Sequence, residues 1–124
     1  MQPSFVAVVD DDASVCRATQ ALLRSRGIPS VAYASAEVFL SSSEGRQASC
    51  LILDVHLPGL SGWQLQQHLR AEGVKIPAIV VTGGYARGEP LRNDPLPEGV
   101  LAVLDKPFDG DTLVRWVGVA VAHR

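Results

Sequence analysis

Aspartates stand at the carboxyl ends of two apolar runs in this sequence of 124 residues. Asp10 and Asp11 follow the first run, and Asp54 ends the second. A third run ends at Thr82, and a fourth leads into Lys106. Apolar runs of this length are typical of strands buried on both faces of a parallel sheet, where chemistry collects beyond the carboxyl ends of the strands. The pattern therefore directs three carboxylates, one hydroxyl and one ammonium group to the same place.

Such a concentration of negative charge needs compensation. Carboxylates about 5 Å apart repel by roughly 3 kcal/mol per pair at an effective dielectric near 20. Lys106 offsets one of the three negative charges, which leaves about the charge that a divalent cation neutralises. Ligands that are all oxygen, with no histidine or thiolate, favour magnesium. On the spacing alone, a magnesium site and a strained acidic patch without metal are equally good interpretations.

The neighbouring groups suit a phosphoryl group. A carboxylate that attacks phosphorus needs a metal to hold the phosphoryl group, and hydroxyl or cationic donors for its oxygens. Thr82 is followed by two glycines that let backbone amides approach an anion, and Lys106 precedes Pro107, whose ring fixes the backbone. Taken singly, Thr82 and Lys106 are better explained as an ordinary strand residue and an exposed lysine. Together with Asp54 they favour a phosphoryl site.

Strand and helix patterns alternate along the chain, which predicts an α/β fold with a doubly wound parallel sheet. The expected strands cover residues 6–9, 31–34, 50–54, 79–82 and 100–104. We expect a first helix capped by Asp12 or Ser14 and ended by Gly27, with a buried face of Val15, Ala18, Leu22 and Leu23. A brief helix follows Ser35, and the next carries Trp63, Leu65 and Leu69. The last has Leu113, Val114, Val117 and Val121 on one face.

One crossover departs from this pattern. The segment 83–99, between the fourth and fifth strands, holds three prolines, at 90, 95 and 97, and three glycines before them. An interior proline costs a helix about 3 kcal/mol and restricts the residue before it. At most one turn could start at Pro90. We therefore expect the helix between these two strands to be degenerate or absent.

Length and composition bound the class of protein. The chain fits one domain, residues 1–124, and its 47% hydrophobic and 19% charged residues are those of a globular protein. With a net charge of −2 and scattered basic residues, we expect no binding of nucleic acid by this chain alone. Its apolar stretches are too short to span a membrane and no signal peptide is visible, so the expected location is cytoplasmic. Cys16 and Cys50 match no metal spacing and are expected to be buried and reduced.

The sequence resembles the response-regulator receiver domain of two-component signalling. The resemblance is carried by VVDDD at 8–12, LILDVHLPGLSG at 51–62, VVTG at 80–83 and DKPF at 105–108, four motifs that spread over almost the whole chain. It implies a flavodoxin-like, five-stranded parallel sheet of order 2-1-3-4-5. It also implies a phosphoacceptor that switches a surface for a downstream protein that the sequence does not identify.

The resemblance assigns roles to the site residues. Asp54 would accept a phosphoryl group from the phosphohistidine of a sensor histidine kinase or a phosphotransfer protein. Thr82 and Lys106 would contact the phosphoryl oxygens, and the bond between Lys106 and Pro107 would be cis. Mg²⁺ would be held by Asp10, Asp11, Asp54 and the backbone carbonyl of His56. On this interpretation the chain is not an enzyme, and it promotes only its own phosphorylation and dephosphorylation.

Two positions depart from the family pattern. Receivers usually carry an aromatic residue three positions before the lysine, and here that residue is Val103. They also usually have a helix where this chain has the segment 83–99. An interaction module with an atypical output is therefore the alternative function. A phosphohydrolase with an aspartate nucleophile is less well supported, because it needs an aspartate two residues after Asp54, where this chain has His56, and a cap domain.

Overall fold

The structure of the chain, a computed structural model, describes residues 5–57, 59–82, 98–106 and 108–122. The strands in this part are β1 (Val6–Val9), β2 (Ser30–Tyr33), β3 (Cys50–Asp54), β4 (Ala78–Thr82) and β5 (Val100–Asp105). The helices are α1 (Ala13–Ser25), α2 (Ala36–Ser41), the short 3-10 helix η1 (Gly45–Gln47), α3 (Gly62–Ala71) and α4 (Gly110–Ala122). No helix among these residues is long and apolar enough to cross a membrane.

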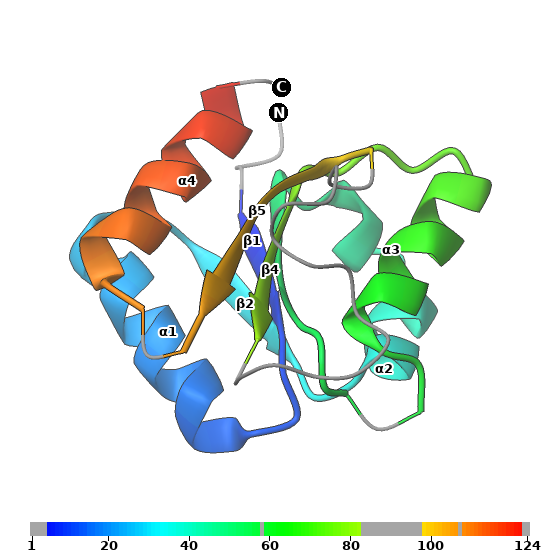
Figure 1. The fold of residues 1–124 in the computed structure, drawn as a ribbon, viewed down its shortest axis with the longest axis horizontal. Coiled ribbons are helices and arrows are strands. Elements are labelled where there is room, and N and C mark those ends of the chain that lie inside the picture. The colour runs from blue at the N-terminus through cyan, green and yellow to red at the C-terminus, as the bar shows by residue number, and fades with distance from the viewer. Residues whose placement is uncertain (1–4, 58, 83–97, 107, 123–124) are drawn as a thin grey trace.

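The described strands form one parallel sheet of five strands in the order β2-β1-β3-β4-β5 (Figure 1). This order confirms the fold class expected from the resemblance. Val9 of β1 is paired with Leu53 of β3, and Thr82 of β4 is paired with Asp105 of β5. Asp10, which follows β1, is therefore level with Asp54, the last residue of β3, at the same edge of the sheet at which β4 and β5 end.

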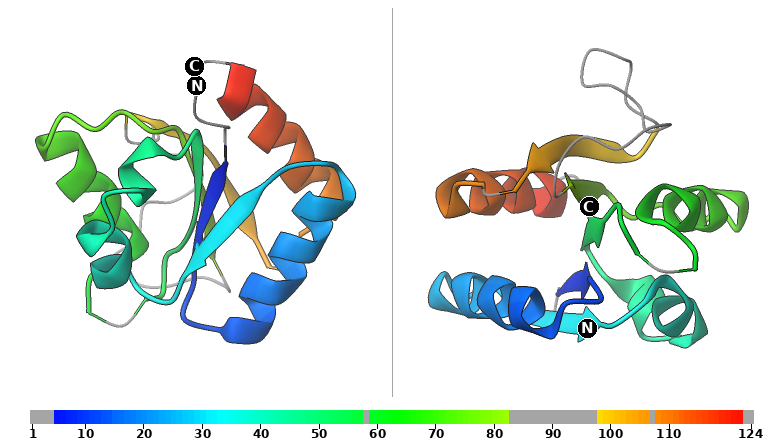
Figure 2. Two further views of the ribbon diagram at one scale, coloured as in Figure 1. Left: turned by 180° about the vertical axis from the view of Figure 1, so that it is seen from behind. Right: turned by 60° about the horizontal axis from the view of Figure 1, so that its bottom comes forward.

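Helices cover both faces of the sheet: α1 and α4 lie on one face, and α2 and α3 on the other (Figures 1 and 2). Alternate residues of each strand point to opposite faces, so the core has two parts. On the side of α1 and α4, Val8 and Ile52 pack with Leu113. On the side of α2 and α3, Val9 packs with Phe39.

Helix α1 begins with Asp12 as its N-cap, one of the two residues predicted for that role. The Asp12 carboxylate accepts hydrogen bonds from the backbone N–H groups of Ser14 and Val15 at 2.9 and 3.3 Å. The prediction that Ala18 belongs to the buried face is wrong, because Ala18 is exposed. The buried residues of this helix are Cys16, Thr19 and Leu23, whose spacing of three and four places them in one row facing the sheet.

Helix α4 buries Leu113, Val117 and Ala120, and the prediction that Val121 lies on this face is wrong, because its side chain is 38% exposed. Val121 lies only about 40° around the helix from Val117 but about 100° from the buried Ala120, which puts it at the exposed margin of this face. The expected degenerate helix between β4 and β5 falls on the segment 83–97. That segment, Pro107 and residues 123–124 lie outside the described residues, so the corresponding expectations stay predictions.

Candidate functional site

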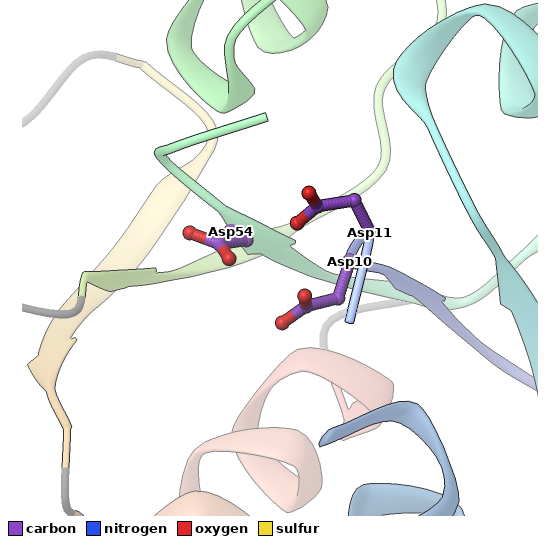
Figure 3. Close-up of side chains that lie close together, drawn as sticks. All are labelled: Asp10, Asp11 and Asp54. Atoms are coloured by element: carbon purple, nitrogen blue, oxygen red, sulfur yellow. The ribbon is translucent and has the colours of Figure 1, made fainter. Parts of the chain in front are cut away.

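The ends of β1 and β3 bring three carboxylates together (Figure 3). Each of Asp10, Asp11 and Asp54 offers one oxygen such that all three oxygens lie within 4.8 Å of one another. Asp10 and Asp54 are only 5% and 7% exposed, whereas Asp11 is open to solvent. The cluster therefore has a buried pair and an outer member, and it occupies the edge of the sheet at which the sequence places it.

Each buried carboxylate is tied to its own loop in the same way. Oδ1 of Asp10 accepts a hydrogen bond from the backbone N–H of Asp12 at 2.9 Å. Oδ1 of Asp54 accepts one from the backbone N–H of His56, also at 2.9 Å. These bonds fix one oxygen of each side chain and leave the second oxygen, Oδ2, directed at the other groups of the site.

Lys106 lies between these second oxygens. Its Nζ is 3.5 Å from Oδ2 of Asp10 and 3.4 Å from Oδ2 of Asp54. Burial lowers the pKa of Lys106, but the charges of Asp54 and Asp10 outweigh that effect, so its pKa lies above the ordinary value of 10.5. Lys106 is therefore a permanent cation at neutral pH, as the charge argument from the sequence requires.

The pKa of Asp10 is shifted by its position in the cluster. Burial raises the pKa of Asp10 above its ordinary value of 3.8, and the nearby charge of Asp54 raises it further. The hydrogen bond from Asp12 and the charge of Lys106 act in the opposite direction without cancelling the rise. The rise in the pKa is due first to burial, and three carboxylates face the single positive charge of Lys106, a charge balance that suits a further cation.

Thr82 and His56 complete the set predicted from the sequence. Thr82 is buried at the end of β4, and its backbone carbonyl accepts a hydrogen bond from the backbone N–H of Lys106 at 2.8 Å. The Thr82 hydroxyl is 3.5 Å from Nε2 of the His56 ring, the outer limit for a hydrogen bond. All the side chains proposed for the site therefore come from one end of the sheet. Gly84 and Tyr85, which follow Thr82, lie outside the described residues.

The start of α3 packs directly on the backbone of β3. A methyl group at Gly62 would approach the backbone carbonyl oxygen of Asp54 to 2.6 Å, so only glycine fits there. Ser61 caps the helix with its side chain on the N–H of Gln64, and the Gln64 side chain bonds the N–H of Ser61 in return. This capping box holds the far end of the loop between β3 and α3.

Three residues around the site were missed by the sequence argument. Thr19 and Phe108 line a small pocket beneath the carboxylates, on the side of α1. The thiol of Cys16 donates to the backbone carbonyl of Asp10 at 3.3 Å. The spacing of Cys16 and Thr19 after the helix cap Asp12 is a signal that could have placed both side chains toward the sheet. Phe108 belongs to a motif that the resemblance used without giving its aromatic ring a role.

The donor set suits a hard cation. All three clustered side chains offer carboxylate oxygens, and the described residues hold no histidine or thiolate in the cluster. Oxygen ligands, together with a second cation supplied by Lys106, match what magnesium and a phosphoryl group require. The residues present therefore fit the metal that the sequence predicts.

Comparison with known proteins identifies relatives across almost the whole chain. A family model described as the response regulator receiver domain matches residues 6–117. Nodulation protein W of Bradyrhizobium diazoefficiens is 39% identical over 122 residues, which are 98% of this chain and 52% of that protein. The chain thus spans about half the length of the curated relatives it matches.

Solved structures give the same result. The crystal structure of FixJ-N has a TM-score of 0.84 and 28% identity, and the match covers 100% of this chain and 98% of that one. The receiver domain of a sensor histidine kinase from Pseudomonas aeruginosa has a TM-score of 0.80 and 25% identity, covering 98% of this chain and 99% of that one. That domain was solved with a magnesium ion coordinated in its active-site cleft.

Proposed function

Because the chain belongs to the response regulator receiver domain family, we propose that it accepts a phosphoryl group on Asp54. Receiver domains are the phosphoacceptors of two-component systems, and the chain has that role as a class. The observation that carries the assignment to Asp54 is its position: a buried carboxylate with one oxygen held by the His56 N–H and the other 3.4 Å from Lys106. We take residues 1–124 to be a single receiver domain.

The proposed donor is the phosphohistidine of a sensor histidine kinase or of a phosphotransfer protein. In the transfer, a carboxylate oxygen of Asp54 forms a bond to phosphorus as the P–N bond of the donor breaks. The products are an acyl phosphate on Asp54 and the histidine of the donor. Loss of the phosphoryl group by attack of water on the acyl phosphate, promoted by the chain itself, completes the proposed cycle.

Asp10, Asp11 and Asp54, with the backbone carbonyl of His56, would hold Mg²⁺. The support is the all-oxygen cluster and the raised pKa of Asp10, which burial causes and the charge of Asp54 strengthens. The magnesium in the P. aeruginosa receiver domain supports the same choice of metal. When bound, Mg²⁺ would supply positive charge that draws the phosphoryl oxygens toward the site and lowers the repulsion among the carboxylates.

Lys106 and Thr82 are proposed to contact the phosphoryl oxygens after transfer. Lys106 already faces the reacting carboxylate, so only a short movement of its flexible side chain would bring it to an added phosphoryl group. The Thr82 hydroxyl can donate once it turns toward Asp54. A donor that turns from one partner to another gives the two states of the site different surroundings, as a switch requires.

The function of the whole protein is a proposal as well, since the chain corresponds to about half of its curated relatives. We propose that the receiver acts on a downstream protein or domain that the sequence does not identify. It would do so without contacting nucleic acid or membrane itself. A cytoplasmic location is proposed with this function, and two cysteines that are buried and free fit a reducing compartment.

Acetyl phosphate, a small phosphoryl donor, tests the proposal without a partner kinase. We expect intact-mass measurements to show one added phosphoryl group on the native chain in magnesium and none in chelator, and none on Asp54→Asn. Asp12→Asn is the matched control, because an asparagine can still cap α1. Phosphorylation retained in Asp54→Asn would refute the assignment. A native chain that is never labelled, by acetyl phosphate or by a kinase, would instead favour the interaction module.

A further inference from the structure

The loop between β3 and α3 carries the backbone that faces the site. Near its start, the N–H of His56 bonds the carboxylate of Asp54. At its end, the N–H of Gly62 bonds the carbonyl of Val55 at 3.3 Å. The first part of the loop is also joined to β4, because the N–H of Val55 bonds the carbonyl of Val81 at 3.0 Å and the His56 ring lies 3.5 Å from the Thr82 hydroxyl. These contacts do not connect the second part of the loop, residues 59–61, to another element.

A residue of α2 makes that connection for the second part of the loop. Oε2 of Glu37, on α2, accepts a hydrogen bond from the backbone N–H of Leu60 at 3.1 Å, across 23 positions of sequence. The adjacent Gly59 has a φ of +75°, and a methyl group there would come within 2.5 Å of the same carboxylate oxygen. The loop is therefore shaped closely around the Glu37 side chain.

Glu37 is well placed to act as a fixed support. It lies in the first turn of α2, a helix that starts at the N-cap Ser35, whose hydroxyl accepts from the N–H of Val38 at 3.0 Å. Ala36 and Phe39, its neighbours in this helix, are completely buried. The backbone of Glu37 is thus held by the core, while its carboxylate reaches out to the loop.

We propose that Glu37 is a positioning residue for the acceptor site. By holding the Leu60 N–H it fixes the loop so that the His56 backbone stays in place for the metal and for the Asp54 carboxylate. This inference rests on the proposed function, and it adds a residue of α2 that neither the motifs nor the cluster of carboxylates includes. Glu37 itself touches neither the metal ligands nor Asp54 in any described contact, so its effect passes through the loop.

Two substitutions separate the hydrogen bond from the charge. Glu37→Gln keeps a carbonyl oxygen that can accept from Leu60 but removes the charge, and Glu37→Ala removes both. The matched control is Glu44→Ala, because Glu44 is an exposed glutamate from the same region with no described side-chain partner. All variants are made in a Trp116→Phe background, so that Trp63, at the start of α3, reports alone on the loop by its fluorescence.

The measurements are a Mg²⁺ titration followed by Trp63 fluorescence, the rate of phosphorylation by acetyl phosphate, amide hydrogen exchange at Leu60, and the urea midpoint. We expect Glu37→Ala to weaken Mg²⁺ binding by about two- to tenfold, the range that one net hydrogen bond allows. Phosphorylation should slow in proportion, and Leu60 should exchange faster. We expect Glu37→Gln to restore all three quantities to near the native values, and Glu44→Ala to change none of them.

Three results would overturn the proposal. In the first, Leu60 exchanges faster in Glu37→Ala while Mg²⁺ affinity and phosphorylation stay native, so the bond exists but positions nothing. In the second, Glu37→Gln is as impaired as Glu37→Ala, so the charge acts and not the hydrogen bond. In the third, the urea midpoint falls while Mg²⁺ affinity, the phosphorylation rate and exchange at Leu60 stay native, so the role of Glu37 is structural. Failure of the native chain itself to bind Mg²⁺ and to be labelled would instead refute the proposed function.

Discussion

Replacing Asp10 with asparagine should stabilise the metal-free protein, although it removes half of an apparent ion pair. At an effective dielectric near 20, Asp10 gains roughly 4.7 kcal/mol from Lys106 at 3.5 Å. It loses roughly 3.5 kcal/mol to Asp54 at up to 4.8 Å. The exposed Asp11 adds about 1 kcal/mol of repulsion when water screens it. The charge interactions therefore nearly cancel, and the burial of Asp10 decides the sign.

Asparagine avoids the cost of burying a charge and keeps the bond that Asp10 makes to the Asp12 N–H, because its carbonyl oxygen can accept as Oδ1 does. We expect Asp10→Asn to raise the free energy of unfolding by about 1 kcal/mol at pH 7 in chelator. The direction agrees with the pKa of Asp10, which burial raises above 3.8. The folded state binds the Asp10 proton more tightly than the unfolded state does. The native chain therefore loses stability relative to the variant as the pH rises through this raised pKa.

Urea denaturation across pH measures the difference. The advantage of Asp10→Asn should be full at pH 7, shrink as the pH falls through the raised pKa, and vanish below 3.8, where Asp10 is protonated in both states. Magnesium should act in the opposite direction. Free metal at ten times its dissociation constant stabilises the native chain by about 1.4 kcal/mol, and the variant, with one carboxylate fewer, by less. The gap between the two proteins should therefore close.

Glu44→Gln is the control for this experiment, since it removes an exposed carboxylate that does not belong to the cluster. The reasoning fails if Asp10→Asn is less stable than the native chain at pH 7 in chelator while Glu44→Gln is unchanged. Attraction to Lys106 would then outweigh burial and repulsion together, and the site would be balanced without a metal. An advantage that persists below pH 3 would show that packing, not charge, is the cause.

Other substitutions test the remaining contacts. Lys106→Met should lower the unfolding free energy by about 1–2 kcal/mol in chelator. Burial lowers the pKa of Lys106, but the neighbouring carboxylates outweigh it and raise the pKa above 10.5. In urea titrations the loss of unfolding free energy should therefore be full up to pH 10.5 and shrink as the pH rises through the higher pKa of the folded state. Gly62→Ala should cost about 2 kcal/mol or more, because its methyl group would meet a backbone carbonyl at 2.6 Å. Gly118→Ala, in open space on α4, should instead raise the unfolding free energy by about 0.5–1 kcal/mol. Equal urea midpoints for Gly62→Ala and Gly118→Ala would contradict this reasoning. Gln66→Ala should cost about 1–2 kcal/mol in thermal unfolding, since its buried amide donates to a backbone carbonyl just before β5, whereas exposed Gln67→Ala should not.

The fold was predictable because its strands are buried on both faces. Such strands appear in the sequence as continuous apolar runs, so β1, β3, β4 and β5 could be located to within a residue or two. Helix faces were less certain, since they depend on the exact phase of a 3.6-residue period. Ala18 and Val121 are apolar enough for either side, and only packing against the sheet decides that Cys16 and Ala120 point inward. The short helix η1 has no apolar period, so the sequence carries no signal for it.

The site was predictable to the extent that parallel strands end together. The alternation of side chains along each strand also explains why two of the three aspartates are buried and one is exposed, a distinction that the sequence analysis did not draw. Side chains alternate between the faces of a sheet, so Asp10 continues the row of Val8, and Asp54 continues the row of Ile52. Asp11 falls outside this alternation and is exposed. The contact from Glu37 could not be found in this way, because it joins two elements whose distance the sequence does not specify.

The arrangement also explains why the site can be rigid before anything binds. Asp10 and Asp54 each use Oδ1 to accept from the N–H two residues further on, which holds Oδ2 of each side chain toward Lys106. Lys106 can approach both second oxygens but compensates only part of their charge. The cation proposed for this site would therefore find its carboxylate ligands already oriented, and its binding would relieve the repulsion among them. A carboxylate cluster that stabilised the empty domain better would bind the cation less tightly, so the instability assigned to Asp10 is a condition of the proposed function.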